Sequence, residues 1–160
     1  MAPENQHPLP CADTHNTTLF TEWLQTFASY VREVDYESAR PLFHTNVIAF
    51  GTHEDVIASL DEWVRSQWDN VWPKTTDFEF NLEQTKILIS EDASMATVIA
   101  PWTSTGYHQD NSVFDRPGRA TMIFQKRLDN WLCIHSHMSL NRGVPQQSFA
   151  NRPVKSGAEL

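Results

Sequence analysis

The apolar part of the chain ends with Asn130-Trp131-Leu132-Cys133-Ile134-His135-Ser136-His137-Met138-Ser139, which we interpret as the last strand of the domain. Successive side chains of a strand alternate between its two faces. One face then carries Trp131, Cys133, His135, His137 and Ser139, and the other carries the residues between them. A face with two imidazoles is either exposed to water or directed into a cavity. In the second case it forms a site.

The composition is that of one small domain. Apolar residues make up 40% and aromatic residues 11% of 160 positions, which is enough to bury a core. The 12 basic and 20 acidic residues give a net charge of -8. This balance argues against a nucleic-acid or acidic-membrane partner, because phosphate binding needs clustered Lys and Arg. Without a signal peptide, a long apolar run or a disulfide framework, we expect a cytoplasmic protein.

Hydrophobic periodicity predicts helices first and strands afterwards. Apolar residues recur at helical spacing from Thr18 to Asp35 and from Asp55 to Val71, with a short helix between them at 36–40. Alternating patterns predict strands at 46–50, 78–89, 94–105, 113–126 and from 130 onward. We expect a flexible leader (1–16), one domain (17–142) and an extended or disordered tail (143–160). Helices followed by a meander of long antiparallel strands form an α+β fold, with the helices packed on one face of a curved sheet.

Several motifs resemble one family. Phe50-Gly51-Thr52, Gln67-Trp68, Gly118-Arg119-Ala120-Thr121 and the final strand, in this order of elements, are similar to a SnoaL-like domain of the nuclear transport factor 2-like and ketosteroid isomerase-like superfamily. The pattern Trp131-x-x-x-His135-x-His137-x-Ser139 also resembles the end of the association domain of calcium/calmodulin-dependent kinase II. The resemblance covers residues 19–145. It implies a cone-shaped, strongly curved antiparallel sheet with a mostly apolar pocket between sheet and helices.

His135 and His137 are the first candidate site residues, and three interpretations stay open for them. In the first, one imidazole bridges strands by hydrogen bonding while the other lies at the pocket wall. In the second, the pair binds a metal. In the third, His137 transfers a proton while His135 orients the His137 ring or shares its charge. A metal site would need further ligands from residues such as His53, Glu54, His108 or Asp110, in no established ligand pattern. We therefore expect no metal and no cofactor.

Other candidates would bind the substrate. Arg119 would hold an anion if its strand pairs with the last one, although a salt bridge to Asp110, Asp115 or a helix carboxylate is an equal alternative. Thr121 follows it in the same motif, and Tyr107 is a second group for stabilising an oxyanion. Asp35 is a candidate base, or a solvated helix junction. Trp63, Trp68 and Trp72 would form an aromatic wall against the sheet, whereas Trp102 would line the pocket or a dimer surface.

Mainly because of the resemblance to the SnoaL-like family, we expect a small-molecule-binding protein that acts as a cofactor-independent enzyme of the isomerase, cyclase, hydratase or lyase type. The alternative is a non-catalytic association or ligand-sensing module that binds a small carboxylate. A metal-dependent enzyme built on the histidine pair is the third hypothesis. In each case we expect a small organic partner and a homodimer, or a higher homo-oligomer, formed through the sheet.

Overall fold

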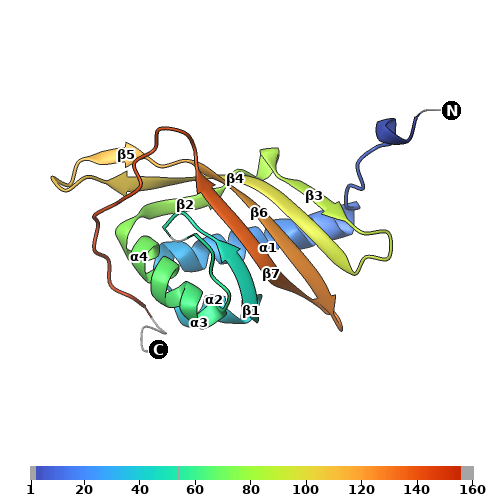
Figure 1. Cartoon of the computed structure of the whole chain (residues 1–160), viewed down its shortest axis with the longest axis horizontal. Helices are drawn as coiled ribbons and strands as arrows, with labels where there is room; N and C mark the ends of the chain where they lie inside the picture. Colours follow the sequence, from blue (N-terminus) through green and yellow to red (C-terminus); the bar gives the residue numbers. More distant parts are fainter. Residues whose placement is uncertain (1–2, 54, 156–160) are drawn as a thin grey trace.

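The computed structural model describes residues 3–53 and 55–155. It has two layers, with helices packed on one face of a curved sheet that does not close (Figure 1). The helical layer contains α1 (Thr14–Glu33), α2 (Tyr36–Ala39), α3 (Leu60–Trp63) and α4 (Asp69–Val71). The predicted α+β architecture is confirmed.

The sheet has seven strands in the order β1-β7-β6-β4-β2, with β3 and β5 also paired to β4. The pairs are antiparallel except β1–β7, which is parallel. The long strand β4 therefore organises the sheet, since four other strands pair with it. The strands are β1 (Phe43–Phe50), β2 (Thr76–Phe80), β3 (Lys86–Ile89), β4 (Met95–Tyr107), β5 (Val113–Asp115), β6 (Gly118–Arg127) and β7 (Asn130–Leu140).

Helix α1 forms one side of the hydrophobic core. It begins at Thr14, four residues before the predicted start, because the side chain of Asp13 accepts a hydrogen bond from the backbone N–H of Asn16 (2.8 Å) and caps the helix. Its buried stripe has helical spacing and packs against the sheet. The stripe consists of Phe20, Trp23, Leu24, Phe27, Ala28 and Val31.

The second predicted helix, from Asp55 to Val71, is shorter and less regular than its pattern indicates. Ile57 pairs with Ala49 through two backbone hydrogen bonds (2.8 and 2.9 Å), so the chain is still extended there. Ser59 then caps α3, accepting from the backbone N–H of Glu62. A π-helical turn at Val64–Trp68 joins α3 to α4. Such turns insert an extra residue into a helix and are frequent at functional sites.

A β-bulge in β7 overturns the prediction that Trp131, Cys133, His135 and His137 share one face. Opposite β6, Phe124 pairs with Cys133 but Ile123 pairs with His135, so Ile134 is an extra residue. Trp131 and Cys133 are buried in the core, whereas after the bulge Ser136 is the buried residue. The two histidines therefore lie on the outer face of the sheet, away from the helices.

Both ends of the described chain contact the domain. Cys11 bridges to Leu88 of β3. The predicted strand 78–89 is divided into β2 and β3 by a single 3-10 turn at Leu82–Gln84. At the other end, an extended segment runs from β7 across the ends of β4 and β5 toward the helices (Figure 1).

Within residues 3–53 and 55–155, no helix is long and apolar enough to cross a membrane.

Candidate functional site

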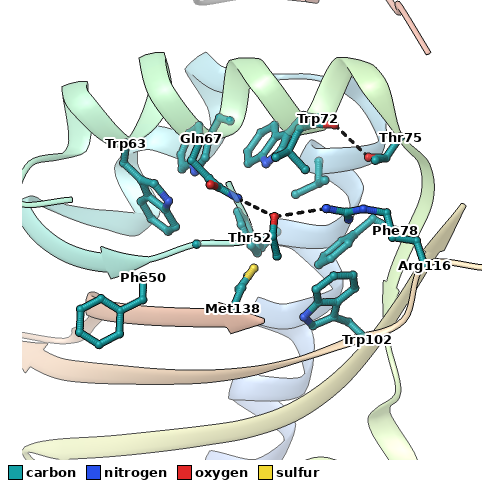
Figure 2. Close-up of a pocket in the computed structure, with 15 residues that line it drawn as sticks. Phe50, Thr52, Trp63, Gln67, Trp72, Thr75, Phe78, Trp102, Arg116 and Met138 are labelled. Atoms are coloured by element: carbon teal, nitrogen blue, oxygen red, sulfur yellow. Dashed lines mark hydrogen bonds between the residues drawn. The ribbon is translucent and has the colours of Figure 1, made fainter. Parts of the chain in front are cut away.

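A pocket lies between the helices and the inner face of the sheet (Figure 2). Its walls come from α1, from the α3–π–α4 segment and from β2, β4 and β7. The free volume in the inner part is about 30 Å³, which is room for one or two water molecules. Most of the lining is apolar or aromatic: Phe27, Val31, Trp63, Trp68, Val71, Trp72, Phe78, Trp102 and Met138.

Three of the pocket tryptophans come from one irregular helical segment. The rings of Trp68 and Trp72 are stacked, with centroids 4.3 Å apart, and Trp63 packs against Trp68 at 5.2 Å. The π turn separates Trp63 from Trp68, and it allows Gln67 and Trp68, neighbours in sequence, both to line the pocket. The helical wall is therefore aromatic with a single amide in it.

Arg116 is the charged side chain of this pocket, and it is only 3% exposed. Its guanidinium donates to Ser104 Oγ (3.3 Å) and Thr52 Oγ1 (3.2 Å) and lies over the ring of Trp102, 5.5 Å from its centroid. No carboxylate among the described residues forms an ion pair with it. Burial lowers the pKa of Arg116 to about 10, so the side chain is still a cation at neutral pH.

A short polar chain fixes the position of Thr52 beside this guanidinium (Figure 2). Gln67 Oε1 accepts from the backbone N–H of His53 (2.9 Å), and Gln67 Nε2 donates to Thr52 Oγ1 (3.0 Å). Gly51 allows this close approach, since a Cβ atom at that position would overlap the Gln67 amide. Arg116, Thr52 and Gln67 thus form one connected polar edge in an otherwise apolar pocket.

An outer chamber of about 290 Å³ adjoins the inner pocket, and Arg116, Val71 and Thr75 line both. His53, Asn70 and Lys74 line the outer chamber together with residues 146–151 of the C-terminal segment. Arg116 therefore lies at the boundary between a small apolar space and a larger polar one.

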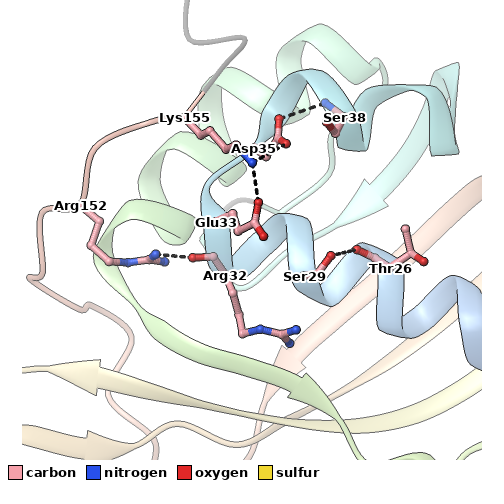
Figure 3. Close-up of polar contacts among 8 residues, drawn as sticks. All are labelled: Thr26, Ser29, Arg32, Glu33, Asp35, Ser38, Arg152 and Lys155. Atoms are coloured by element: carbon pink, nitrogen blue, oxygen red, sulfur yellow. Dashed lines mark hydrogen bonds and ion pairs between the residues drawn. The ribbon is translucent and has the colours of Figure 1, made fainter.

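Hydrogen bonds hold the C-terminal segment over the outer chamber. Ser148 Oγ donates to the carbonyl of Lys74 and accepts from the backbone N–H of Tyr107. Arg152 donates to the carbonyls of Thr75, Trp72 and Arg32, and Lys155 reaches Glu33 (2.7 Å) beyond it (Figure 3). The segment predicted as an extended or disordered tail thus forms one wall of the outer chamber.

The structure divides the sequence-predicted site residues between two faces of the sheet. Trp63, Trp68 and Trp102 line the pocket. Arg119, Thr121 and His137 instead line a shallow depression on the outer face, where Arg119 donates to Ser139 Oγ (3.1 Å). His135 is also on that side: its Nδ1 lies 2.7 Å from the carbonyl oxygen of Ile48. The ring of Phe50 packs against both imidazoles, with centroids 5.1 and 5.0 Å away.

The two remaining candidates do not line the inner pocket. Asp35 is buried at the start of α2, where it accepts from the backbone N–H of Ser38 (3.2 Å) and lies 3.8 Å from Lys155 Nζ (Figure 3). Tyr107 bonds through its hydroxyl to Thr76 Oγ1 (2.8 Å). In the part of the chain that is described, no group of three or more His, Cys, Asp or Glu side chains has the geometry to hold a metal ion.

Sequence reasoning missed Arg116, Thr52 and Gln67 as a unit. Arg116 had a detectable signal, because it has the alternation phase of the buried Ala120, Met122 and Phe124, whereas Arg119 has the opposite phase. Pro117 hid this signal by interrupting the strand pattern. Thr52 and Gln67 belong to motifs that resemble the family, but no sequence pattern indicated their contact, since it depends on how the π turn packs over the end of β1.

Comparison with known proteins agrees with the fold described above. Residues 18–142 match the family model of the SnoaL-like domain, and no curated protein matches the chain significantly. Among solved structures, the association domain of calcium/calmodulin-dependent kinase II from C. elegans is similar with a TM-score of 0.60 and 14% identity, over 78% of this chain and 95% of that one. A dehydratase candidate of the NTF2-like family from Streptomyces avermitilis has a TM-score of 0.65 and 15% identity, over 82% of this chain and 100% of that one. A ketosteroid isomerase-like protein from Erwinia carotovora has a TM-score of 0.65 and 10% identity, over 81% of this chain and 98% of that one.

Proposed function

For this chain, which belongs to the SnoaL-like domain family, we propose the binding of a small organic carboxylate. The apolar body of the ligand would lie among the aromatic side chains, and its carboxylate would bind Arg116. One observation carries this proposal: a cation that is 3% exposed faces the pocket without an acidic partner among the described residues. A buried charge is costly unless an opposite charge pairs with it. Two hydroxyl groups and an aromatic face compensate the guanidinium only in part.

The surroundings of Arg116 suit an anion in other ways. Guanidinium groups bind carboxylates through two parallel hydrogen bonds, and such charge-assisted bonds strengthen where water is excluded. Lys74 adds a second cation to the outer chamber. The ligand would thus approach through a polar chamber and place its apolar part in the inner pocket, which would have to open beyond its present 30 Å³.

Isothermal titration calorimetry with matched ligands tests the proposal. Benzoate, phenylacetate and cyclohexanecarboxylate are each compared with the corresponding neutral amide. We expect the acids to bind, the amides to bind at least tenfold more weakly, and Arg116→Met to abolish the difference. Arg119→Met, which removes a similar charge from the outer face, is the control and keeps it. Equal binding of acids and amides by the wild-type protein would contradict the proposal.

Catalysis is a second proposal, supported by the fold that the chain shares with a dehydratase candidate and a ketosteroid isomerase-like protein. The described side chains of the inner pocket include no carboxylate, imidazole or phenol. His53, which lines the outer chamber beside Arg116, is the proton-transfer group that we propose for an isomerase or lyase reaction, with Arg116 stabilising an oxyanion. His53→Ala should then stop turnover of a ligand identified by calorimetry and leave its affinity nearly unchanged. The catalytic roles of His137, His135 and Asp35 stay predictions.

We also propose that two copies of the chain associate through the outer face of the sheet. Ile48 and Ile99 are 49% and 42% exposed there, on the face that carries His135 and His137. Sedimentation velocity tests this: Ile99→Asp should convert a dimer to a monomer. Leu128→Asp introduces the same charge at the exposed turn between β6 and β7, outside the strands that form this face, and should leave the dimer intact. A monomeric wild-type protein would contradict the proposal.

A further inference from the structure

We infer that the pocket selects ligands that carry a second hydrogen-bond acceptor next to the carboxylate, such as 2-oxo acids, over 2-hydroxy and 2-amino acids. This inference rests on the proposed function, because it assumes that the carboxylate binds Arg116. Beyond the carboxylate, it specifies which hydrogen-bonding groups the rest of the ligand carries. The polar groups that face the pocket are mainly donors, and they converge from the helical wall and from the sheet.

Three buried N–H groups of the pocket have no hydrogen-bond partner among the described residues: Nε1 of Trp63, Nε1 of Trp102 and Nε of Arg116. The side chains are 2%, 1% and 3% exposed. In Figure 2 the indole nitrogen of Trp63 is on the ring edge turned toward the middle of the pocket, and that of Trp102 is on the edge turned toward Met138. Each of these groups can only donate, and a buried donor without an acceptor is unfavourable.

The hydroxyl of Thr52 adds a fourth donor by elimination. The backbone N–H of His53 must donate, so the Gln67 atom that it contacts is the amide oxygen. The amide nitrogen of Gln67 then faces Thr52 Oγ1 and donates to it, and Arg116 donates to the same oxygen. Both lone pairs of Thr52 are thereby occupied, and its O–H is left to donate elsewhere.

Acceptors are scarce on the same walls. Ser104 Oγ, behind Arg116, accepts from the guanidinium and donates to the Arg116 carbonyl. Thr75, whose hydroxyl donates to the carbonyl of Val71 (3.1 Å), keeps acceptor capacity on its oxygen. Among the described side chains of these walls, the four donors named above therefore outnumber the acceptors, which are the hydroxyl oxygen of Thr75 and the amide oxygen of Gln67 that already accepts from His53.

This polarity discriminates between ligands of equal size. A keto oxygen beside the carboxylate accepts from the indole or hydroxyl donors and brings no proton of its own. A hydroxyl at that position accepts too, but its proton meets mostly other donors, and an ammonium brings three protons and a positive charge near Arg116. Sites that leave polar groups unpaired with one ligand but not with another discriminate strongly between them.

Benzoylformate, mandelate and phenylglycine form a matched series for the test, since they differ only in a keto, hydroxyl or ammonium group beside the carboxylate. We expect titration calorimetry to rank them in this order, with benzoylformate at least tenfold tighter than mandelate. Phenylacetate, which has no such group, measures carboxylate binding alone. Mandelate binding as tightly as benzoylformate while phenylacetate binds would overturn this inference and leave the proposed function intact. Failure of all four ligands to bind would overturn both.

Two conservative variants locate the donors. Trp63→Phe and Trp102→Phe each remove one N–H and keep an aromatic ring, and at least one should reduce the ratio of benzoylformate to phenylacetate affinity by threefold or more. Trp23→Phe is the matched control, because its indole N–H is also buried without a described partner but does not line the pocket. Melting curves confirm folding of each variant. An unchanged ratio in both folded pocket variants would contradict a role for the indole donors.

Discussion

Arg116 and Arg119 are three residues apart, but they lie on opposite faces of one sheet. The inner arginine is buried under an aromatic wall and bonds to two hydroxyl groups, whereas the outer arginine is exposed and bonds to Ser139. Solvent screens the charge of Arg119, while the charge of Arg116 acts in a medium of low dielectric constant. Residue type alone therefore does not identify an anion site. The face of the strand decides it.

Removing each arginine in turn is the strongest test of the difference between the two faces. Arg116→Met should weaken binding of a carboxylate about 100-fold, equivalent to ~3 kcal/mol, because a buried charge-assisted pair is lost. Arg119→Met should change affinity less than threefold. Titration calorimetry of both variants with benzoylformate measures the difference. Similar losses in the two variants would show that the ligand contacts the outer face.

Gly118 tests how tightly the inner face is packed. A Cβ atom there would overlap the ring of Trp102 and the carbonyl oxygen of Ser139, and a backbone atom cannot move aside as a flexible side chain does. Gly118→Ala should lower the free energy of unfolding by about 2 kcal/mol. Thr121→Ala, on the outer face of the same strand, should cost less than about 1 kcal/mol. Urea denaturation curves compare the two, and equal costs would contradict the packing difference.

Arg116 should also affect the stability of the ligand-free protein, in the opposite direction to its effect on binding. Replacing a buried charge without an ionic partner by an apolar side chain of similar length removes a desolvation cost. We expect Arg116→Met to raise the free energy of unfolding by about 1 kcal/mol and the melting temperature by about 2–4 °C. Differential scanning calorimetry measures this shift. A lower melting temperature would mean that the bonds to Thr52 and Ser104 outweigh the cost of burial.

The smallest expected effect concerns His137. Because this side chain lies in the outer depression with Arg119 and Thr121, His137→Ala should change ligand affinity less than twofold and stability by less than about 0.5 kcal/mol. The measurement repeats the calorimetric titration and the melting curve. A large loss of affinity would restore the sequence-based assignment of this histidine to the binding site.

Much of the fold was predictable from the sequence, because it depends on periodic burial. The apolar stripe from Phe20 to Val31 identified α1, and the change of period after Pro73 identified the start of the main strands. The bulge at Ile134 was not predictable, since an inserted residue leaves no mark in an apolar run. The start of α3 was misplaced for a similar reason: Ile57 fits the helical stripe but pairs as a strand residue with Ala49.

Only the aromatic part of the candidate site was predictable from the sequence, because side-chain size determines its burial. Three predicted tryptophans line the pocket because large aromatic rings are buried wherever the fold provides space. The polar part depends on contacts between distant segments, as in the hydrogen bond from Gln67 to Thr52 and that from Arg116 to Thr52. Alternation favoured Arg116 over Arg119, but the proline between strands β5 and β6 obscured the phase.

The bulge in β7 also has a genetic consequence. Deleting the single codon for Ile134 would remove the extra residue and leave the other side chains on their present faces, with Ser136 and Met138 inside and both imidazoles outside. If the strand kept Ile134 but lost the bulge, regular alternation from Cys133 would instead place the two imidazoles on the inner face in place of Ser136 and Met138. The bulge thus separates a pocket wall with a thioether from one with two titratable rings. A change in where this strand is bulged gives such a fold a short mutational route to new chemistry.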